Sequence, residues 1–294
     1  MNRKLRVAVQ LLREKGPGKL LAVVCSRVWV AGQVLLRGAK RTVTIDGCQF
    51  YLGDLPNNMM KLALQKGLYE APEREAVRKY MQPNWGVVEL GACIGVVSCV
   101  TNKLLRNPAA HVVIELNPMA VPHLIANRQR NNCSFKVLNC ALAYDANQVS
   151  LSPHLEFWGN FLHQAGTRPP VSVPVTQLER ILNDEGFDEF AVICDVEGQE
   201  IELLKHEMET LRKASLIIME LHPHMIGGEN SEMILSALAQ EGFQVERQSA
   251  NIVVFTNVPR KPVAAARESA AVASSCPLIR GDGTAMNLAS PRLQ

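Results

Sequence analysis

Five short apolar segments alternate with longer helical patterns between residues 85 and 220. The apolar segments, which we predict to be strands, span residues 85–90, 110–115, 134–139, 190–195 and 215–220. The helical patterns between them span residues 94–105, 118–131, 176–184 and 198–212. This alternation predicts a parallel sheet with helices on both faces, because each helix crosses over between two parallel strands.

The pattern changes after residue 230. A helix predicted over 231–241 is followed by two strands, 243–247 and 252–256, which are separated by a tight turn. Two strands joined so closely must be antiparallel. The expected fold class is therefore α/β, with a doubly wound, mostly parallel seven-stranded sheet that ends in an antiparallel hairpin.

Residues 42–80 have a pattern of their own. Two strand-like segments, 42–45 and 48–52, flank Asp46-Gly47, a pair that favours a type I′ hairpin turn. Two short helical patterns follow, the second over residues 71–80. We therefore predict a hairpin and two helices before the first strand of the large sheet.

Charge divides the chain into three parts. Residues 1–41 carry ten Lys and Arg residues and one acid, so this predicted helical arm has a charge of +9. Residues 42–258, the predicted α/β domain, carry 16 basic and 25 acidic residues, a charge of −9. Residues 259–294 are rich in Ala, Ser and Pro, which predicts a disordered tail. Because nucleic acid binds positive surfaces, the acidic domain predicts no nucleic-acid partner.

The eight cysteines form no Cys-x-x-Cys pair and have no regular spacing, which predicts neither a disulfide framework nor a zinc site. Several lie in apolar runs, where a reduced thiol behaves as a small hydrophobic side chain. The apolar stretch 20–36 contains Arg27 near its centre, and a central arginine costs about 2.5–3.5 kcal/mol on insertion scales. We therefore expect a cytoplasmic protein with no membrane span and no bound metal.

The first segment with chemical content is the strand-to-helix turn at residues 87–95. Gly91 permits a sharp turn, and Gly95 lets the backbone approach a ligand where a helix begins and free N–H groups bind polar atoms. A dinucleotide fingerprint would need glycines in place of Cys93 and Val96, and the Lys-Ser/Thr of a phosphate-binding loop is missing. The turn favours a nucleoside without a pyrophosphate and disfavours an oxidoreductase. A tight turn without a ligand is the alternative.

Glu115 ends the next predicted strand, 20 residues after Gly95. An acid in this position can accept hydrogen bonds from both ribose hydroxyls of a bound nucleoside. The alternative is a solvated carboxylate at the end of a strand. The register between Glu115 and the glycine turn favours the ribose contact.

Four ionisable residues follow the fourth and fifth predicted strands: Asp195, Glu197, Glu220 and His222. In open α/β sheets the ligand lies beyond the carboxyl ends of the strands, so these side chains are expected to converge on one crevice. For each of them, a structural role such as capping the following helix is the alternative.

An ordered series of motifs between about residue 67 and residue 223 resembles the FkbM family of methyltransferases. The series consists of Gly-Leu-Tyr-Glu at 67–70, Glu-Leu-Gly-Ala-Cys-Ile-Gly at 89–95, Glu-Leu-Asn-Pro at 115–118, the region of Asn127, Ala-Leu at 141–142, Val-Pro-Val-Thr-Gln-Leu at 173–178, Asp-Val-Glu-Gly-Gln-Glu at 195–200 and Glu-Leu-His at 220–222. The order of the motifs is more specific than any one of them.

The resemblance implies a Rossmann-like class I methyltransferase domain over residues 42–258, with S-adenosylmethionine as the cofactor. It also implies O-methylation of a hydroxyl on a sugar, glycan or secondary metabolite. The cofactor contacts that it implies are Glu89, Gly91, Ala92, Cys93, Gly95, Glu115, Asn117, Ala141 and Asp195. The chain departs from the usual family residues Asp, Asn, Pro and Lys, which are here Glu89, Cys93, Leu116 and Ile193.

Methylation of a hydroxyl requires a base that takes the hydroxyl proton. An imidazole with an unperturbed pKa near ~6.5 is largely neutral at physiological pH, so we predict His222 as the base. Asp195 and Glu220 are predicted to position the acceptor, and Glu197, Trp158 and Asn160 to contact it. A tryptophan in the loop 157–160 can stack on a sugar face, although a packing role is the alternative.

Two other functions stay open. Methyl transfer to a nitrogen or to a carboxylate differs from ether formation in the mass and the hydrolytic stability of the product. A non-catalytic protein with a cofactor fold, which binds a partner through the basic arm, would show no turnover.

We predict that the arm, residues 1–41, makes peripheral contact with an anionic membrane, because it combines its +9 charge with an amphipathic first helix. Each basic residue near such a surface contributes about 1 kcal/mol, which added salt screens. In flotation assays the protein should rise with anionic vesicles at low salt and less so at high salt. Equal flotation with neutral vesicles would contradict the prediction and favour an arm that packs on the domain.

Overall fold

The computed structural model describes residues 42–55, 57–151, 170–247, 249 and 251–257, with residue 32 and two short strands at 278–279 and 285–286. Apart from residue 32, the predicted basic arm lies outside the described residues, as does the loop 157–160 with Trp158 and Asn160. Of the helices in the described part of the chain, none combines the length and apolar character of a membrane span.

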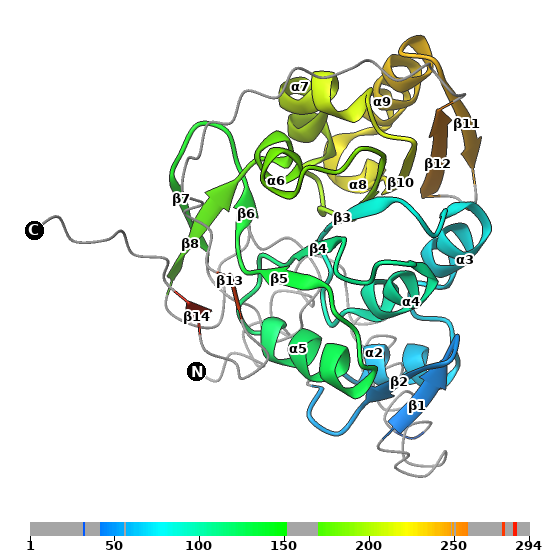
Figure 1. Cartoon of the computed structure of the whole chain (residues 1–294), viewed down its shortest axis with the longest axis vertical. Coiled ribbons are helices and arrows are strands. Elements are labelled where there is room, and N and C mark those ends of the chain that lie inside the picture. The colour runs from blue at the N-terminus through cyan, green and yellow to red at the C-terminus, as the bar shows by residue number, and fades with distance from the viewer. Residues whose placement is uncertain are drawn as a thin grey trace, which may run out of the picture. The chain divides into compact units, whose positions relative to one another are not determined.

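The large sheet has nine strands in the order β11-β12-β10-β9-β3-β4-β5-β13-β14 (Figure 1). The parallel strands are β10 (Leu216–Glu220), β9 (Phe190–Cys194), β3 (Gly86–Leu90), β4 (His111–Ile114) and β5 (Lys136–Leu138). At one edge, β11 (Phe243–Arg247) and β12 (Ile252–Asn257) form an antiparallel hairpin, and β12 pairs with β10. These seven strands confirm the predicted mostly parallel sheet and its closing hairpin.

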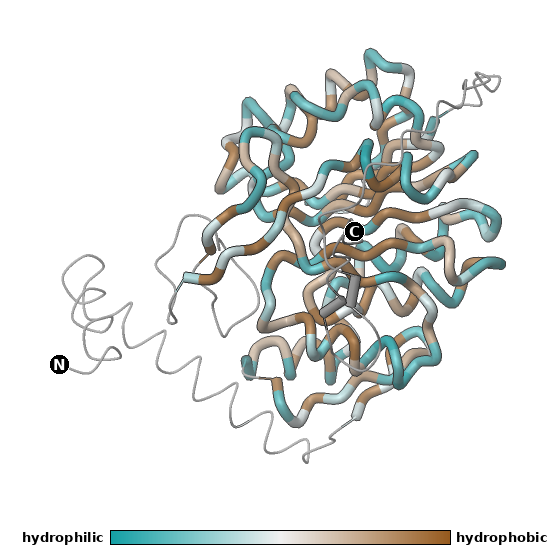
Figure 2. Tube along the Cα trace, turned by 60° about the vertical axis from the view of Figure 1, so that its left-hand side comes forward, coloured by the Kyte–Doolittle hydropathy of each residue, from teal (hydrophilic) through white to brown (hydrophobic). Residues whose placement is uncertain are grey.

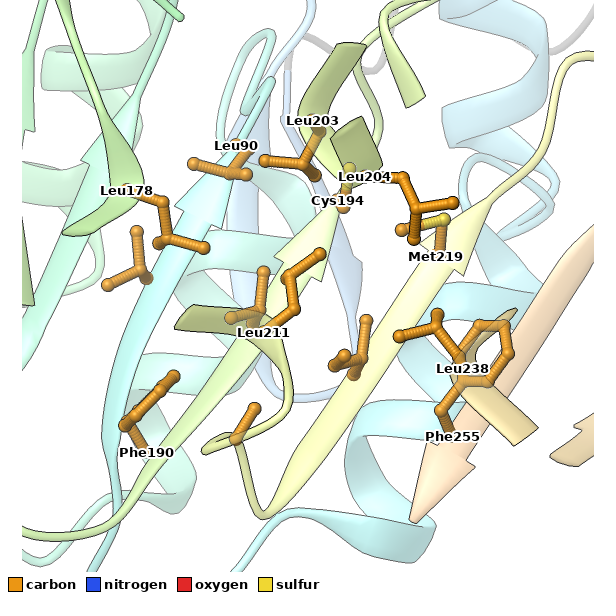
Figure 3. Close-up of a cluster of buried hydrophobic side chains, with 14 of the residues drawn as sticks. Leu90, Leu178, Phe190, Cys194, Leu203, Leu204, Leu211, Met219, Leu238 and Phe255 are labelled. Carbon is orange, nitrogen blue, oxygen red and sulfur yellow. The ribbon is translucent and has the colours of Figure 1, made fainter. Parts of the chain in front are cut away.

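The strands are buried because helices cover both faces of the sheet, and Figure 2 shows apolar residues along them. One face packs against α6 (Leu178–Glu185), α7 (Glu200–Leu211) and α9 (Gly228–Gln240), and Figure 3 shows the core there. The other face packs against α3 (Ala71–Tyr80) and α4 (Val96–Leu104), and α5 (Val121–Arg130) contacts α4. Along β3, Val88 and Leu90 belong to the first core and Val87 to the second, as expected for a strand between two helical layers.

The N-terminal hairpin pairs β1 (Thr42–Ile45) with β2 (Cys48–Tyr51). Asp46 and Gly47 between them both have positive φ, +48° and +81°, as a type I′ turn requires. Helix α2 (Asn58–Gln65) follows, and the side chain of Asn57 caps it by accepting hydrogen bonds from the N–H groups of Met59 and Met60. The hairpin and two helices predicted before the sheet are therefore present.

A second sheet, which the sequence did not predict, consists of β6 (Ala141–Leu142), β8 (Val171–Thr176) and β7 (Gln148–Leu151), in that spatial order. The helix predicted over 176–184 begins later, at Leu178, because β8 continues to Thr176. The strand β6 has only two residues, and β7 and β8 begin with exposed residues, so none of the three forms the continuous apolar run of a strand buried on both faces. The short helix α8 (Pro223–Ile226) was not predicted either.

Within the predicted disordered tail the structure places two paired strands, β13 (Leu278–Ile279) and β14 (Ala285–Met286). At these four residues it differs from the prediction. The physical reason is that β5 would otherwise be an edge strand, whose free backbone groups accept an additional strand, and β13 pairs with it antiparallel. The rest of 259–294 lies outside the described residues.

Helix α6 is capped by a residue distant in sequence. The buried carboxylate of Glu207 on α7 accepts hydrogen bonds from the N–H groups of Leu178 at 2.6 Å and Glu179 at 3.2 Å, the first two residues of α6. Burial raises the pKa of Glu207, and these hydrogen bonds oppose that rise. The contact fixes α6 against α7, the helix that begins beside the carboxyl end of β9.

We expect Glu207→Ala to lower the free energy of unfolding by about 1–3 kcal/mol, because it leaves two helix N–H groups without acceptors. Urea unfolding measures the change. Glu209→Ala is the matched control, since Glu209 lies on the same helix with its side chain 74% exposed, and it should change stability by less than about 0.5 kcal/mol. Equal unfolding midpoints for the two variants would contradict the capping role.

Candidate functional site

The turn after β3 approaches the end of β9 more closely than any side chain at position 91 would permit. Gly91 has φ +87°, and a Cβ there would lie 1.7 Å from the backbone oxygen of Asp195. The N–H groups of Gly91 and Ala92 both donate to the carbonyl of Ile114, at 2.9 and 3.0 Å. The predicted sharp turn at Gly91 is therefore present, and its position is set by two neighbouring strands.

The second half of the turn leads into α4. Cys93 and Gly95 have positive φ, +49° and +79°, and a Cβ at Gly95 would lie 2.3 Å from the side chain of Leu124. Gly95 is the N-cap residue and has no side chain that could cap the helix. Asn127 donates from Nδ2 to the carbonyl of Ile94 at 2.9 Å, which ties the turn to α5.

Glu115 ties the turn to the end of β4. Its side-chain oxygens accept hydrogen bonds from the backbone N–H of Cys93 and of Asn117, both at 2.6 Å. Only 6% of Glu115 is exposed. Burial raises its pKa to about 7, the charge of Glu89 adds to the rise, and the two hydrogen bonds oppose it. Each carboxylate oxygen has two lone pairs, so each can still accept a hydroxyl hydrogen bond from a ligand.

Two other predicted cofactor contacts lie near this region. Asn117 is fully buried, and its Oδ1 accepts from the N–H of Met119 at 3.0 Å. Ala141 is buried in β6.

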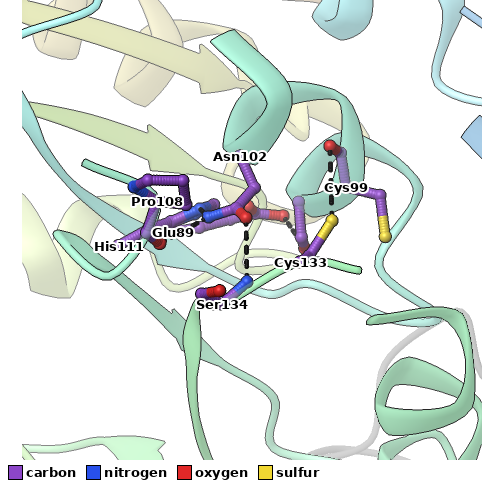
Figure 4. A network of polar contacts seen from close by, with 8 residues as sticks. Glu89, Cys99, Asn102, Pro108, His111, Cys133 and Ser134 are labelled. Atoms are coloured by element: carbon purple, nitrogen blue, oxygen red, sulfur yellow. Dashed lines mark hydrogen bonds and ion pairs between the residues drawn. The ribbon is translucent and has the colours of Figure 1, made fainter. Parts of the chain in front are cut away.

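Glu89, also predicted as a cofactor contact, uses both carboxylate oxygens on protein partners (Figure 4). Oε1 accepts from the hydroxyl of Ser98 at 2.7 Å, and Oε2 lies 3.2 Å from Nε2 of His111. Asn102 contacts the other ring nitrogen of His111 at 3.4 Å. This buried network joins β3, β4 and α4. Nothing in the sequence predicted this network, although Ser98 and Asn102 stand one helical turn apart.

The four ionisable residues predicted to converge do lie together. Nε2 of His222 lies 3.5 Å from Glu197, 3.6 Å from Asp195 and 3.8 Å from Glu220, each distance to a carboxylate oxygen. Asp195 follows β9 and Glu220 ends β10, two neighbouring parallel strands, which explains the convergence. His222 is only 5% exposed.

Glu200, which the sequence analysis did not single out, orients the imidazole. Its carboxylate, fully buried at the start of α7, lies 2.6 Å from Nδ1 of His222 and accepts from the N–H of Gly198 at 3.0 Å. Burial lowers the pKa of His222, but the Glu200 hydrogen bond and the charges of Glu200, Glu197 and Glu220 raise it more. The net pKa is above its ordinary value. The imidazole therefore binds a proton more readily than the sequence analysis assumed.

Two further acids come from the start of α3. Glu70 and Glu73 line a cavity of about 20 Å³ together with Asp195 and Glu220. Burial, followed by the charge of Glu220, raises the pKa of Glu73 to about 8. Burial and the surrounding carboxylates also raise the pKa of Asp195 well above its ordinary range. The motif at 67–70 contained Glu70, but nothing in the sequence placed α3 beside β9 and β10.

Residues 89–245, more than half of the chain, match the family model described as the methyltransferase FkbM domain. No curated protein matches the chain.

Three solved structures are similar at low identity. Fibrillarin from Aeropyrum pernix with natively bound S-adenosyl-L-methionine is 11% identical (TM-score 0.38) over 75% of this chain and 83% of that one. Precorrin-6y C5,15-methyltransferase from Geobacter metallireducens is 12% identical (TM-score 0.39) over 70% and 93%. A tRNA methyltransferase from M. jannaschii is 12% identical (TM-score 0.39) over 74% and 57%.

Proposed function

Because the chain belongs to the family of methyltransferase FkbM domains, we propose that it transfers a methyl group from S-adenosylmethionine to a hydroxyl of a sugar, glycan or secondary metabolite. The observation that carries the proposal is the tie between Glu115 and the N–H of Cys93 in the glycine turn. It joins the two features that a nucleoside ligand needs, a carboxylate for the ribose and a backbone turn beside it.

The residues present fit this cofactor. Glu115 offers lone pairs on both carboxylate oxygens to the ribose hydroxyls. The turn from Gly91 to Gly95 leads into a helix whose N-cap residue is a glycine, and free N–H groups at a helix start bind polar ligand atoms. When bound, S-adenosylmethionine supplies a methyl group already activated by its sulfonium.

The acidic crevice is the proposed acceptor site. Asp195, Glu220 and His222 stand beyond the carboxyl ends of β9 and β10, next to the turn at Gly91. We propose that His222 takes the hydroxyl proton and that Asp195 and Glu220 hold the acceptor hydroxyl in line with the methyl group. Glu197, within 3.5 Å of His222, is proposed to contact the acceptor with Trp158 and Asn160.

The alternatives concern the acceptor atom. Transfer to nitrogen or to a carboxylate would give a different product, and base hydrolysis separates an ester from an ether. The expectation that nucleic acid is not the acceptor rests on the charge of −9 over residues 42–258 and stays a prediction. Incubation with labelled cofactor and a panel of glycosides, hydroxylated polyketides and tRNA tests it directly.

Glu115→Ala should weaken S-adenosylmethionine binding by roughly 30- to 1000-fold, the equivalent of about 2–4 kcal/mol, because hydrogen bonds to both ribose hydroxyls are lost. Calorimetry measures the affinity, and circular dichroism checks that the fold is kept. Glu189→Ala, which removes an exposed acid before β9, is the control and should bind normally. An unchanged affinity in Glu115→Ala would remove the main support for the cofactor.

Measuring the affinity for S-adenosylmethionine over a pH series, in the wild type and in Glu115→Gln, tests whether the negative charge of Glu115 contributes to binding. Wild-type affinity should fall as the pH drops below about 7, because protonation of Glu115 removes a hydrogen-bond acceptor. The affinity of Glu115→Gln should be flat over the same range.

His222→Ala and Asp195→Asn should each slow single-turnover methyl transfer at saturating cofactor, by about 10²–10⁴-fold if they act on the hydroxyl proton. The matched controls are His206→Ala and Asp188→Asn, which change exposed residues of the same types. If both site variants transfer at the wild-type rate, neither residue takes part in the chemical step. Alignment of the acceptor with the methyl group would then have to account for the whole acceleration of methyl transfer.

A further inference from the structure

In the described part of the chain, the crevice gathers four carboxylates around one imidazole. Nε2 of His222 faces Asp195, Glu197 and Glu220 within 4 Å, while Nδ1 faces Glu200. Among the described residues, no lysine or arginine forms an ion pair with these four carboxylates. Like charges this close repel one another strongly when buried, so the arrangement favours either a bound proton or a cation between them.

The ligand atoms are spaced as in a metal site. One carboxylate oxygen each of Asp195 and Glu220 and a ring nitrogen of His222 all lie within 4.8 Å of one another. Two ligands at about 2.1 Å from a shared ion, at a tetrahedral angle, lie about 3.4 Å apart. The observed separations of 3.6 and 3.8 Å from Nε2 to Asp195 and Glu220 need little contraction to reach this spacing.

The imidazole is already held as metal-binding histidines are. Such a histidine donates its second ring N–H to a carboxylate or a carbonyl, which fixes the tautomer and directs the other nitrogen to the metal. Glu200 provides this carboxylate, at 2.6 Å from Nδ1, and is fully buried. Nε2 is therefore the nitrogen that faces the carboxylates of Asp195 and Glu220.

Two buried oxygens point to the same conclusion as the histidine. Oδ1 of Asp195 and Oε2 of Glu73 are both inaccessible to solvent, and among the described residues neither has a hydrogen-bond partner. Glu73 is only 8% exposed and lines the cavity that Asp195 and Glu220 also line. Because a buried polar atom without a partner is costly, such atoms commonly mark a water or an ion.

We propose that Asp195, Glu220 and His222 bind a divalent transition-metal ion, with Glu200 orienting the histidine. Imidazole together with carboxylates suits Mn²⁺, Fe²⁺ or Zn²⁺, whereas Mg²⁺ and Ca²⁺ prefer oxygen ligands alone. Three protein ligands leave open positions on the ion. The role of those positions, which rests on the proposed function, is to hold the acceptor hydroxyl beside the turn at Gly91. Nε2 of His222 then serves as a metal ligand in place of its proposed role on the hydroxyl proton. The sequence predicted no metal because the ligands come from two separate strands.

The test uses the full chain stripped of metal with a chelator, in the absence of cofactor and acceptor. Titration with Mn²⁺, followed by electron paramagnetic resonance and calorimetry, should show one equivalent bound per chain. Asp195→Asn, Glu220→Gln and His222→Ala should each weaken binding at least tenfold, and Glu200→Gln should weaken it by about 10- to 100-fold. Glu202→Gln, an exposed acid on the same helix as Glu200, should bind like the wild type.

A thermal shift assay keeps the test valid if a variant is less stable. Mn²⁺ should raise the melting temperature of the wild type and of Glu202→Gln, but not of Asp195→Asn. Zn²⁺ bound at one equivalent with the same variant pattern would also support the proposal. Absence of Mn²⁺ and Zn²⁺ binding, binding of Mg²⁺ alone, or binding that the ligand variants leave unchanged would overturn it. Calorimetry with S-adenosylmethionine on the same preparation reports separately on the proposed function.

Discussion

The parallel pairing of β3 with β9 is the constraint on which the whole crevice depends. Leu90 lies opposite Cys194, and the N–H of Asp195 donates to the carbonyl of Leu90 at 2.9 Å. Directly beyond this pair, Gly91 and Asp195 meet backbone to backbone. The cofactor turn and the acidic cluster therefore begin at the same point in the fold, where one strand continues into a turn and its neighbour into the acids.

Most of the large sheet could be predicted because its strands are buried on both faces. Such strands leave continuous apolar runs, so the predicted segments 190–195 and 215–220 match β9 and β10 to within one residue at each end. The strand β6 was missed because it has only two residues, and β7 and β8 were missed because both begin with exposed residues and neither forms a continuous apolar run. Pairing with β5, a tertiary event, places β13 in a segment whose composition predicts disorder.

The functional site likewise has one part that could be predicted from the sequence and one part that could not. The convergence of Asp195, Glu220 and His222 follows from topology alone, since the carboxyl ends of parallel strands share one edge of a sheet. The buried acids Glu200 and Glu73, which decide the chemistry of these residues, do not follow from topology. Glu200 stands at a helix start, where an acid is favourable beside the helix dipole whatever else it contacts, and Glu73 comes from a helix that precedes the sheet. Only packing shows that both are buried next to the cluster.

The hydrogen bonds from Cys93 and Asn117 to Glu115 affect how a ligand would bind. They hold the turn in a conformation with positive φ at Gly91, Cys93 and Gly95 through contacts within the protein itself. The entropy lost in ordering these residues is therefore part of the free energy of folding and not of association. A nucleoside that enters this turn meets a preorganised surface. The free energy of binding therefore includes little cost for ordering the loop and reflects mainly the contacts that the ligand makes.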